Sequence, residues 1–194
     1  MYIFGASGHG KVVISALESR GIHISGVFDD NEALKTCLHY PVKVYNEIED
    51  HHDNSFIIAI GDNVVREKVY ERLGRGAWYG VVIHEKAVVN DYIRYEEGTV
   101  VMASATVQPG TQLGKHVIIN TSAVVDHDCL IGDFVHIAPR ATLCGGVQVG
   151  KGSLVGAGST VLPGIQIGEN CTIGAGATVL RNVNDGETVY GVVK

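Results

Sequence analysis

The sequence contains little proline, little cysteine and no segment dense in positive charge. Its 194 residues include four prolines and four cysteines, and the formal net charge is −6. A protein that binds nucleic acid normally presents a face rich in Lys and Arg, and no such cluster occurs here. No apolar run approaches the length of a membrane span, and no basic segment precedes the first apolar residues. We therefore expect no nucleic-acid partner, no membrane span and no secretory signal.

The few cysteines follow neither the spacing of a zinc motif nor that of a disulfide framework. They are Cys37, Cys129, Cys144 and Cys171. Cysteines that stay reduced favour a cytoplasmic location, and we expect no bound metal.

Glycine is abundant, with 25 residues, and much of it belongs to a six-residue repeat. Steps of six from Ile83 to Val179 reach seventeen positions, and all of them except Tyr95 are aliphatic. The residue four places after each of these positions is small or apolar. Glycine directly follows the aliphatic residue six times, and we expect it to supply unusual backbone angles at turns there. These glycines are Gly114, Gly132, Gly150, Gly156, Gly168 and Gly174.

A period of six matches neither the 3.6-residue period of a helix nor a simple alternating strand. It fits a short strand followed by a tight turn, and three such units close a triangular coil. Coils of this kind stack as parallel strands about 4.8 Å apart. The repeat therefore predicts a mainly β protein, with a parallel β-helix over residues 81–194.

Residues 1–80 follow a different, βαβ-like pattern that predicts a small Rossmann-like α/β subdomain with a parallel sheet. We expect strands over 2–6, 24–28 and 55–60, and helices over 11–20 and from 63 to about 73. The segment Gly5-Ala6-Ser7-Gly8-His9-Gly10 joins the first strand to the first helix. Such a turn can bind phosphate on backbone N–H groups, although a glycine turn can also serve packing alone. Its G-x-x-G-x-G spacing favours a mononucleotide over a dinucleotide.

One histidine is placed by the repeat beside a carboxylate and a glycine. His127 lies at a turn and is followed by Asp128, the combination that orients a general base. One coil of eighteen residues later comes Gly145, which would leave space for a ligand and offer a backbone N–H to a developing oxyanion.

A second column, Pro139, Ala157 and Ala175, recurs at the same interval. With its flanking glycines it would make a smooth strip for a pantetheine arm, or it could merely satisfy tight turns. His127 and this strip belong to different faces. A homotrimer with each site between neighbouring protomers would bring them together.

Taken together, these motifs identify the chain as a member of the bacterial sugar O-acyltransferase family of the sialic-acid-synthesis type. Within it the chain resembles most closely the UDP-4-amino-sugar N-acetyltransferases. The residues that carry the resemblance are the glycine-rich turn, Phe28-Asp29-Asp30, Ile60-Gly61-Asp62-Asn63, the run from Asn120 to His127, and the hexads.

The resemblance implies a left-handed β-helix and the transfer of acetyl from acetyl-coenzyme A to a sugar amine in bacterial glycan biosynthesis. It implies that His127 is the base, that Asp128 raises its basicity, and that Gly145 meets the thioester. Coenzyme A would contact His136, Ala157 and Ala175. The UDP-sugar would contact Ser7, Gly8, His9, Asp29, Asp30 and Gly61. Transfer would be direct, without an acyl-cysteine.

Three alternatives stay open on the sequence alone. The acceptor could be a sugar hydroxyl, as in sialic acid O-acetylation. The β-helix could carry a zinc lyase of the carbonic-anhydrase type, for which His116, His127 and His136 are candidate ligands by number but do not form one column. The protein could also bind a nucleotide sugar without catalysis.

Overall fold

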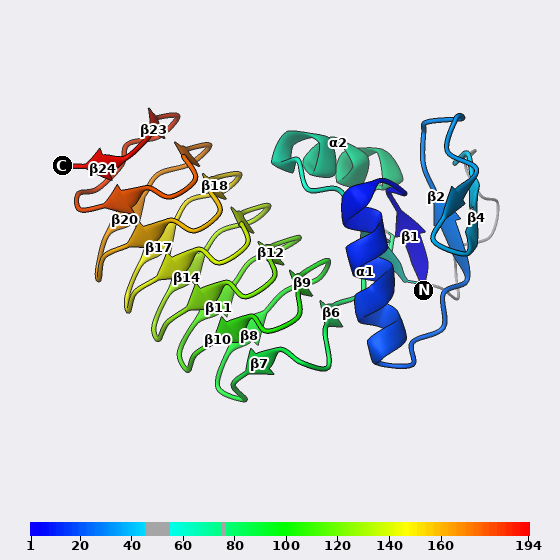
Figure 1. The fold of residues 1–194 in the computed structure, drawn as a ribbon, viewed down its shortest axis with the longest axis horizontal. Helices are drawn as coiled ribbons and strands as arrows, with labels where there is room; N and C mark the ends of the chain where they lie inside the picture. Colours follow the sequence, from blue (N-terminus) through cyan, green and yellow to red (C-terminus); the bar gives the residue numbers. More distant parts are fainter. Residues whose placement is uncertain (46–54, 75–76) are drawn as a thin grey trace.

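The computed structural model describes residues 1–45, 55–74 and 77–194, which form a small α/β unit and a long solenoid of stacked coils (Figure 1). The α/β unit lies beside the first coils, and the carboxyl terminus lies at the far end of the solenoid. The prediction of a parallel β-helix preceded by a Rossmann-like unit is confirmed.

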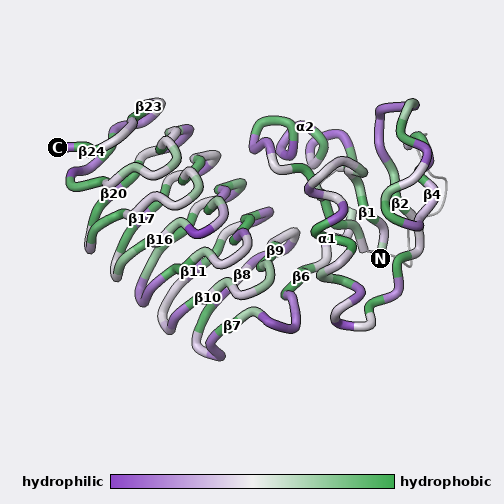
Figure 2. The backbone as a smooth tube through the Cα atoms, in the orientation of Figure 1, coloured by the Kyte–Doolittle hydropathy of each residue, from purple (hydrophilic) through white to green (hydrophobic). Residues whose placement is uncertain are grey.

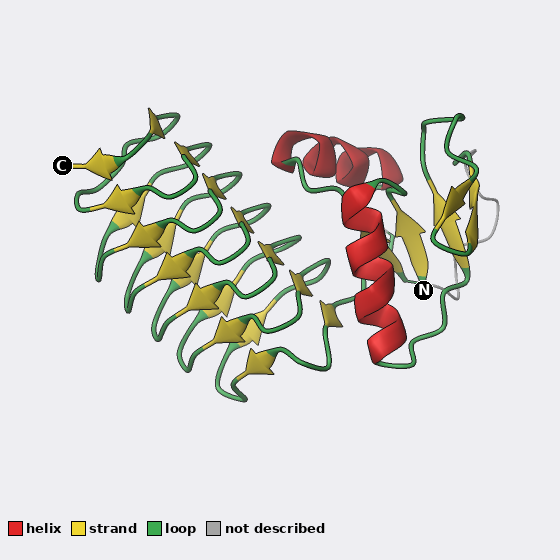
Figure 3. Ribbon diagram, viewed as in Figure 1, coloured by secondary structure: helices red, strands yellow, loops and turns green. Residues whose placement is uncertain are grey.

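The amino-terminal unit is a five-stranded sheet with strand order β3-β4-β2-β1-β5. The central strand β1 pairs in parallel with β2 and β5, as the βαβ pattern predicted, whereas β3 and β4 form an antiparallel hairpin that was not predicted. The two helices (red in Figure 3) pack on opposite faces of the sheet: α1 lies on the face of Ile3, Val27 and Ile57, and α2 lies on the face of Phe4, Phe28 and Ile58. The elements are β1 (Tyr2–Phe4), α1 (Gly8–Ser19), β2 (Gly26–Phe28), β3 (Thr36–Cys37), β4 (Tyr40–Lys43), β5 (Phe56–Ile58) and α2 (Asn63–Leu73).

The solenoid has three flat faces, each a parallel sheet of two-residue strands. Face 1 contains β6 (Val82–Ile83), β9 (Val100–Val101), β12 (Ile118–Ile119), β15 (His136–Ile137), β18 (Leu154–Val155), β21 (Thr172–Ile173) and β23 (Thr188–Val189). Face 2 contains β7 (Val88–Val89), β10 (Thr106–Val107), β13 (Val124–Val125), β16 (Thr142–Leu143), β19 (Thr160–Val161), β22 (Thr178–Val179) and β24 (Val192–Val193). Face 3 contains β8 (Arg94–Tyr95), β11 (Gln112–Leu113), β14 (Leu130–Ile131), β17 (Gln148–Val149) and β20 (Gln166–Ile167).

Stacking keeps equivalent residues in register, so the aliphatic position of each hexad fills the prism. On face 2, Val107 pairs with Val125 and Val125 with Leu143, and all three side chains are at most 1% exposed. Apolar and polar segments alternate along the coils (Figure 2). Each buried aliphatic side chain of this size contributes about 1.5–3 kcal/mol. Tyr95, the one exception in the repeat, is 46% exposed near the beginning of the solenoid.

The corners correct one expectation about glycine. Positive φ occurs at the third residue after a strand, and this position holds Asp128 (φ 58°) and Phe134 (φ 57°) as well as Gly146 (φ 70°). The glycine directly after the strand does not have positive φ. It is required because coils approach closely: a Cβ on Gly132 would lie 2.8 Å from the backbone nitrogen of Lys151 in the next coil.

The two units share a hydrophobic core where face 1 meets the amino-terminal unit. Val82, Val100 and Ile118 point outward from face 1, and they are completely buried in one cluster with residues of α1, such as Val13 and Leu17. This cluster fixes the amino-terminal unit against the first coils. It therefore determines which solenoid residues can meet the loops that follow β1, β2 and β5.

Candidate active site

His127 lies at the corner between faces 2 and 3, directly after β13. Its Nδ1 atom is 2.8 Å from Oδ2 of Asp128, and its backbone N–H donates to Oδ1 of Asp126 over 2.8 Å. Both members of the pair are open to solvent, with side-chain exposures of 60% for His127 and 71% for Asp128. The positive φ of Asp128 turns its carboxylate back onto the preceding ring.

The two neighbouring carboxylates favour the protonated form of His127. The hydrogen bond to Asp128 raises the pKa of His127 above its ordinary value, and the negative charge of Asp126 raises it further. Because Asp128 accepts from Nδ1, the proton of the neutral ring resides there and Nε2 is the acceptor. The arrangement is that of an oriented base.

Gly145 lies against the ring of His127, as the eighteen-residue column predicted. Val125 pairs with Leu143, which places Gly145 one coil further along the same corner. A Cβ atom on Gly145 would lie only 2.5 Å from Nε2 of His127. Among the described residues, the N–H of Gly145 has no hydrogen-bond acceptor. A carbonyl placed beside Nε2 would therefore meet a free backbone donor.

The strip of small residues lies at the corner between faces 1 and 2. Ile137, Val155 and Ile173 are in register on face 1, so the residues two places further, Pro139, Ala157 and Ala175, also stack, and all three are exposed. This corner and the corner of His127 lie at opposite edges of face 2. The predicted separation of the base from the strip within one protomer is therefore present in the structure.

The glycine-rich turn opens helix α1, which begins at Gly8. The side chain of Ser7 at the N-cap position makes no capping hydrogen bond, and the first turn contains no acidic residue. Backbone N–H groups at such an end attract anions. Asp29 holds the turn in place, because its Oδ2 atom accepts from the N–H of Ala6 over 2.7 Å. Its Oδ1 atom accepts from the N–H of Asn31 in its own loop over 2.9 Å, which orients the carboxylate.

Asp30, the neighbour of Asp29, is turned toward helix α2 instead of the glycine-rich turn. It forms an ion pair with Arg72 over 2.9 Å, and both side chains are about half exposed. The guanidinium of Arg72 also covers the ring of Phe4, with 4.8 Å to its centroid. The two acidic residues predicted as a pair thus have different partners.

His136 joins the two units. It points outward from face 1, where its Nδ1 atom is 3.0 Å from the carbonyl oxygen of Gly61 and its Nε2 atom is 3.0 Å from Nδ2 of Asn120. The ring of His9 follows at 6.3 Å between centroids. Burial, together with the positive charge of Arg66, lowers the pKa of His136 to about 4. The structure therefore brings His9, Gly61 and His136 together, and the contact of His136 with coenzyme A stays a prediction.

Comparisons with known proteins match both units. Residues 1–73 match the PglD N-terminal domain, and residues 128–163 and 146–181 match the bacterial transferase hexapeptide family (six repeats). The acetyltransferase domain of PglB from Neisseria gonorrhoeae, solved in complex with acetyl coenzyme A, is 35% identical with a TM-score of 0.91, and the alignment covers 98% of this chain and 95% of that one. The chain belongs to this family of hexapeptide-repeat acyltransferases.

Two further relatives belong to the same group. PerB from Caulobacter crescentus, solved with CoA and GDP-perosamine, is 35% identical with a TM-score of 0.91 over 98% of this chain and 93% of that one. The UDP-N-acetylbacillosamine N-acetyltransferase of Bacillus subtilis is 41% identical over 108 residues, which are 52% of this chain and 50% of that protein. The chain thus spans half of that curated relative, and 23% of a matching mimivirus protein.

The three histidines of the zinc alternative lie in three different surroundings. His116 is completely buried, and its ring stacks on Phe134 at 5.1 Å and contacts Tyr70 and Tyr79. His127 is exposed at another corner, and His136 lies at the interface of the two units. Within the described ranges, no group of three His, Cys, Asp or Glu side chains could hold a metal ion, and no helix is long and apolar enough to cross a membrane.

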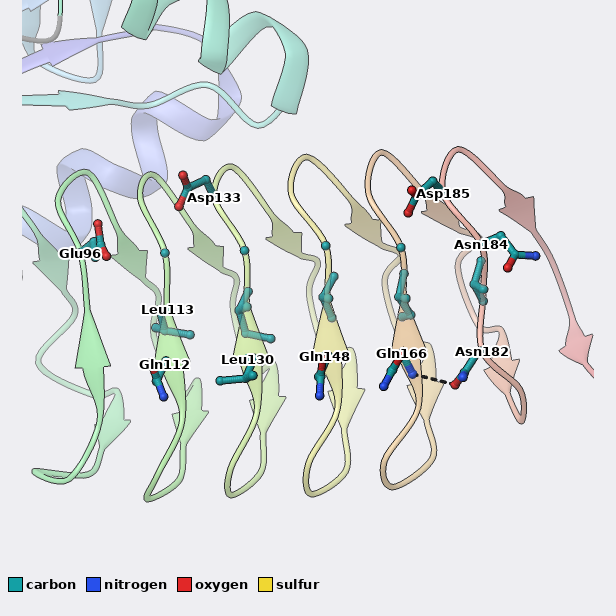
Figure 4. A pocket seen from close by; sticks show the side chains of 18 of the residues that line it. Glu96, Gln112, Leu113, Leu130, Asp133, Gln148, Gln166, Asn182, Asn184 and Asp185 are labelled. Carbon is teal, nitrogen blue, oxygen red and sulfur yellow. Dashed lines mark hydrogen bonds between the residues drawn. The ribbon is translucent and has the colours of Figure 1, made fainter.

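Sequence reasoning missed the residues that hold the predicted site together. Arg66 is completely buried, and with Asn63 it connects helix α2 to the solenoid. Asn63 was quoted only as the last residue of the Ile60-Gly61-Asp62-Asn63 motif, and the only signal for Arg66 was its place three residues further along the chain. The open depression along face 3, lined by Gln112, Gln148 and Gln166 among others, contains none of the predicted site residues (Figure 4).

Proposed function

We propose that the protein transfers the acetyl group of acetyl-coenzyme A to the amino group of a UDP-linked 4-amino sugar in bacterial glycan biosynthesis. The observation that carries this proposal is the contact between an oriented base, His127, and Gly145 with its free N–H. The Bacillus relative named for a UDP-amino sugar supports the substrate class. The complexes of PglB with acetyl coenzyme A and of PerB with GDP-perosamine support the two binding sites.

The geometry suits direct transfer. The neutral sugar amine attacks the thioester carbonyl, so that a C–N bond forms and the C–S bond breaks. Nε2 of His127 accepts the proton of the amine, and the imidazolium then gives a proton to the departing coenzyme A thiolate. The N–H of Gly145 donates to the oxyanion of the tetrahedral intermediate. Asp128 orients the ring and stabilises the imidazolium.

The UDP-sugar would lie on the amino-terminal unit, between the glycine-rich turn and the solenoid. The backbone N–H groups of Ser7, Gly8 and His9 lie at the amino-terminal end of α1, and such an end suits a diphosphate. Gly61 follows the neighbouring strand β5. Asp29 acts on this site by holding the turn, because its Oδ2 atom accepts from the backbone N–H of Ala6. Asp30 would reach the ligand together with its partner Arg72.

Coenzyme A would lie along Ala157 and Ala175, and this location requires a second protomer. Within one chain, face 2 separates this strip from His127. We therefore propose a homotrimer in which the base of one protomer faces the strip of its neighbour. Light scattering should give three times the mass of 20.7 kDa. All four cysteines are free, which suits a cytoplasmic enzyme.

The proposal is tested by mixing the purified protein with acetyl-coenzyme A and UDP-4-amino-4,6-dideoxy-N-acetylglucosamine, and by measuring thiol release. The His127→Ala variant should lose at least about two orders of magnitude in kcat, because a positioned general base contributes that much. The matched control is His23→Ala, which removes an exposed histidine of the amino-terminal unit. Binding of the nucleotide sugar without thiol release would refute amine acetylation. Release with a sialic acid instead would establish a hydroxyl acceptor.

A further inference from the structure

Arg66 is a charged side chain buried without a carboxylate. It is 0% exposed, and all five N–H groups of its guanidinium meet oxygens of carbonyl or amide groups. A buried guanidinium is costly unless every donor is satisfied, and here every donor is. A buried charge with five neutral acceptors indicates a structural device that connects specific backbone groups.

Two of these acceptors belong to the solenoid. Nε of Arg66 donates to the carbonyl of His116 over 3.0 Å, and Nη2 donates to that of Phe134 over 2.7 Å. Both carbonyls belong to the corner residue with positive φ, in successive coils. The next coil provides Gly152 at the same position, and its carbonyl accepts from Nδ2 of Asn63 over 2.9 Å. Helix α2 therefore binds a column of three corner carbonyls.

The remaining acceptors belong to the loop between β5 and α2 and to the first residue of α2. Nη1 of Arg66 donates to the carbonyls of Ile60 and Gly61 over 2.9 and 3.3 Å, and Nη2 donates to Oδ1 of Asn63 over 2.8 Å. One guanidinium thus fixes this loop, which carries the predicted UDP-sugar contact Gly61, directly to the solenoid.

From Gly61 the hydrogen bonds continue across face 1. The N–H of Thr121 donates to Oδ1 of Asn120 over 2.7 Å, which fixes the orientation of the amide. Nδ2 of Asn120 then donates to Nε2 of His136, and Nδ1 of His136 donates to the carbonyl of Gly61. These directions assign the neutral Nδ1–H tautomer to His136. This series of hydrogen bonds ends at Thr121, at the corner between faces 1 and 2, where the strip of small residues lies.

We propose that Arg66 is a positioning residue that sets the nucleotide-sugar loop at Gly61 and the ring of His136 in register with the solenoid. This inference rests on the proposed function, because the loop is taken to bind the nucleotide sugar. Arg66 lies away from His127, at the corner between faces 3 and 1, so its loss should act on sugar binding and leave the base unchanged.

The first test is the Arg66→Lys variant, which keeps the charge but can satisfy at most three of the five acceptors. We expect the KM for the nucleotide sugar to rise about tenfold or more and the KM for acetyl-coenzyme A to change less than about twofold, since lost positioning of one substrate affects that substrate's KM. The pH dependence of kcat, set by His127, should not move.

The matched control is Lys151→Met. Lys151 lies in the solenoid at the corner between faces 3 and 1, and it forms an ion pair over 2.6 Å with Glu67 of α2, the helix that carries Arg66. This pair does not involve the Gly61 loop. This variant should leave both KM values unchanged. Equal changes in both KM values for Arg66→Lys, or a change that Lys151→Met reproduces, would overturn the inference and reduce Arg66 to a general interface contact.

A second measurement is independent of turnover. Nitrogen-15 spectra of the wild-type histidines should show His136 as the Nδ1–H tautomer near pH 7, and Arg66→Lys should lose this fixed tautomer. The same signal unchanged in the variant would overturn the inference. If the wild type shows the tautomer but transfers no acetyl group, the proposed function fails while the positioning role of Arg66 stands.

Discussion

The corner of His127 and the interface of His136 use the same residue in opposite ways. In both, Nδ1 donates to an oxygen, over 2.8 Å to the Asp128 carboxylate and over 3.0 Å to the Gly61 carbonyl. The carboxylate raises the pKa of the exposed His127, whereas burial lowers the pKa of His136 to about 4. The partner and the degree of burial determine which ring can accept a proton at neutral pH.

The second ring nitrogen separates the two histidines further. Nε2 of His136 already accepts from Asn120, so both of its nitrogens serve the interface. Nε2 of His127 faces Gly145, where a substrate could reach it. A histidine acts as a base where one nitrogen is left for the substrate, and it acts as a structural link where both are used.

Among the variants that test this comparison, Gly145→Ala is expected to have the largest effect on activity. The added Cβ would lie 2.5 Å from Nε2 of His127, so the ring must leave its position beside the Gly145 N–H. We expect kcat/KM to fall by about 10²–10⁴-fold, as for the loss of a positioned general base, with an unchanged Tm because the ring is exposed. Steady-state kinetics and calorimetry measure both quantities.

The control for that variant is Cys144→Ser, which changes the adjacent residue without adding an atom next to the ring. It should keep nearly full activity. Full activity of Gly145→Ala would show that the corner of His127 is not the reacting centre, and loss of activity in Cys144→Ser would favour an acyl-cysteine.

The buried histidines should make the protein acid-sensitive in a way that His127 does not. Burial lowers the pKa of His9 and His136 to about 4 and that of His116 to about 3, from an ordinary value of 6.5. The folded state therefore binds fewer protons than the unfolded chain below pH 6.5. The free energy of unfolding should fall on acidification toward pH 4, by about 1.4 kcal/mol per pH unit for each such histidine.

Variants separate these contributions. His116→Phe removes two ring nitrogens that have no hydrogen-bond partner, and it should reduce the proton uptake on unfolding by about one. His127→Asn should act in the opposite direction, since the raised pKa of His127 stabilises the fold at low pH and this contribution is lost as the pH rises through it. Denaturant titrations between pH 4 and 7 measure the slopes. An unchanged slope in His116→Phe would contradict the low pKa of His116.

A smaller effect is expected from Asp128→Asn. Asparagine tolerates the positive φ of this position and can still accept from Nδ1, so the ring keeps its orientation. The carboxylate that raises the pKa of His127 is lost. The acidic limb of the pH–kcat profile, where activity is lost as His127 becomes protonated, should move to lower pH, and kcat at the plateau should fall about tenfold because the base is weaker. A limb that moves to higher pH would contradict the assigned cause.

The contacts that depend on the repeat could be predicted from the sequence. A period of eighteen residues places Gly145 beside His127 and stacks Ala157 on Ala175, since one register governs every coil. The same repeat predicted that His127 and the strip of small residues lie on different faces. Because each coil repeats the position of the one before it, these placements follow from the sequence without any knowledge of side-chain geometry.

The contacts that depend on the interface of the two units could not be predicted. Nothing periodic relates Arg66 to His116 and Phe134, because their corner carbonyls become acceptors only once a helix from outside the solenoid meets them. His136 was predicted from the family as a coenzyme A contact, whereas its hydrogen bonds connect it to Gly61 and Asn120. Asp29 and Asp30 are adjacent in sequence, yet one holds the glycine-rich turn and the other pairs with Arg72.

The smallest effect sharpens the contrast between buried and exposed charges at the interface. Glu67→Gln breaks the ion pair with Lys151, whose side chain is 45% exposed, so we expect a loss of less than about 1 kcal/mol in the free energy of unfolding. Arg66→Met removes a guanidinium from the same helix and leaves buried carbonyls without donors, which should cost about 3 kcal/mol or more. Urea unfolding of both variants at physiological salt gives the comparison. Equal losses would mean that the corner carbonyls are satisfied by water when Arg66 is absent, and that the two units are held together by their shared apolar cluster alone.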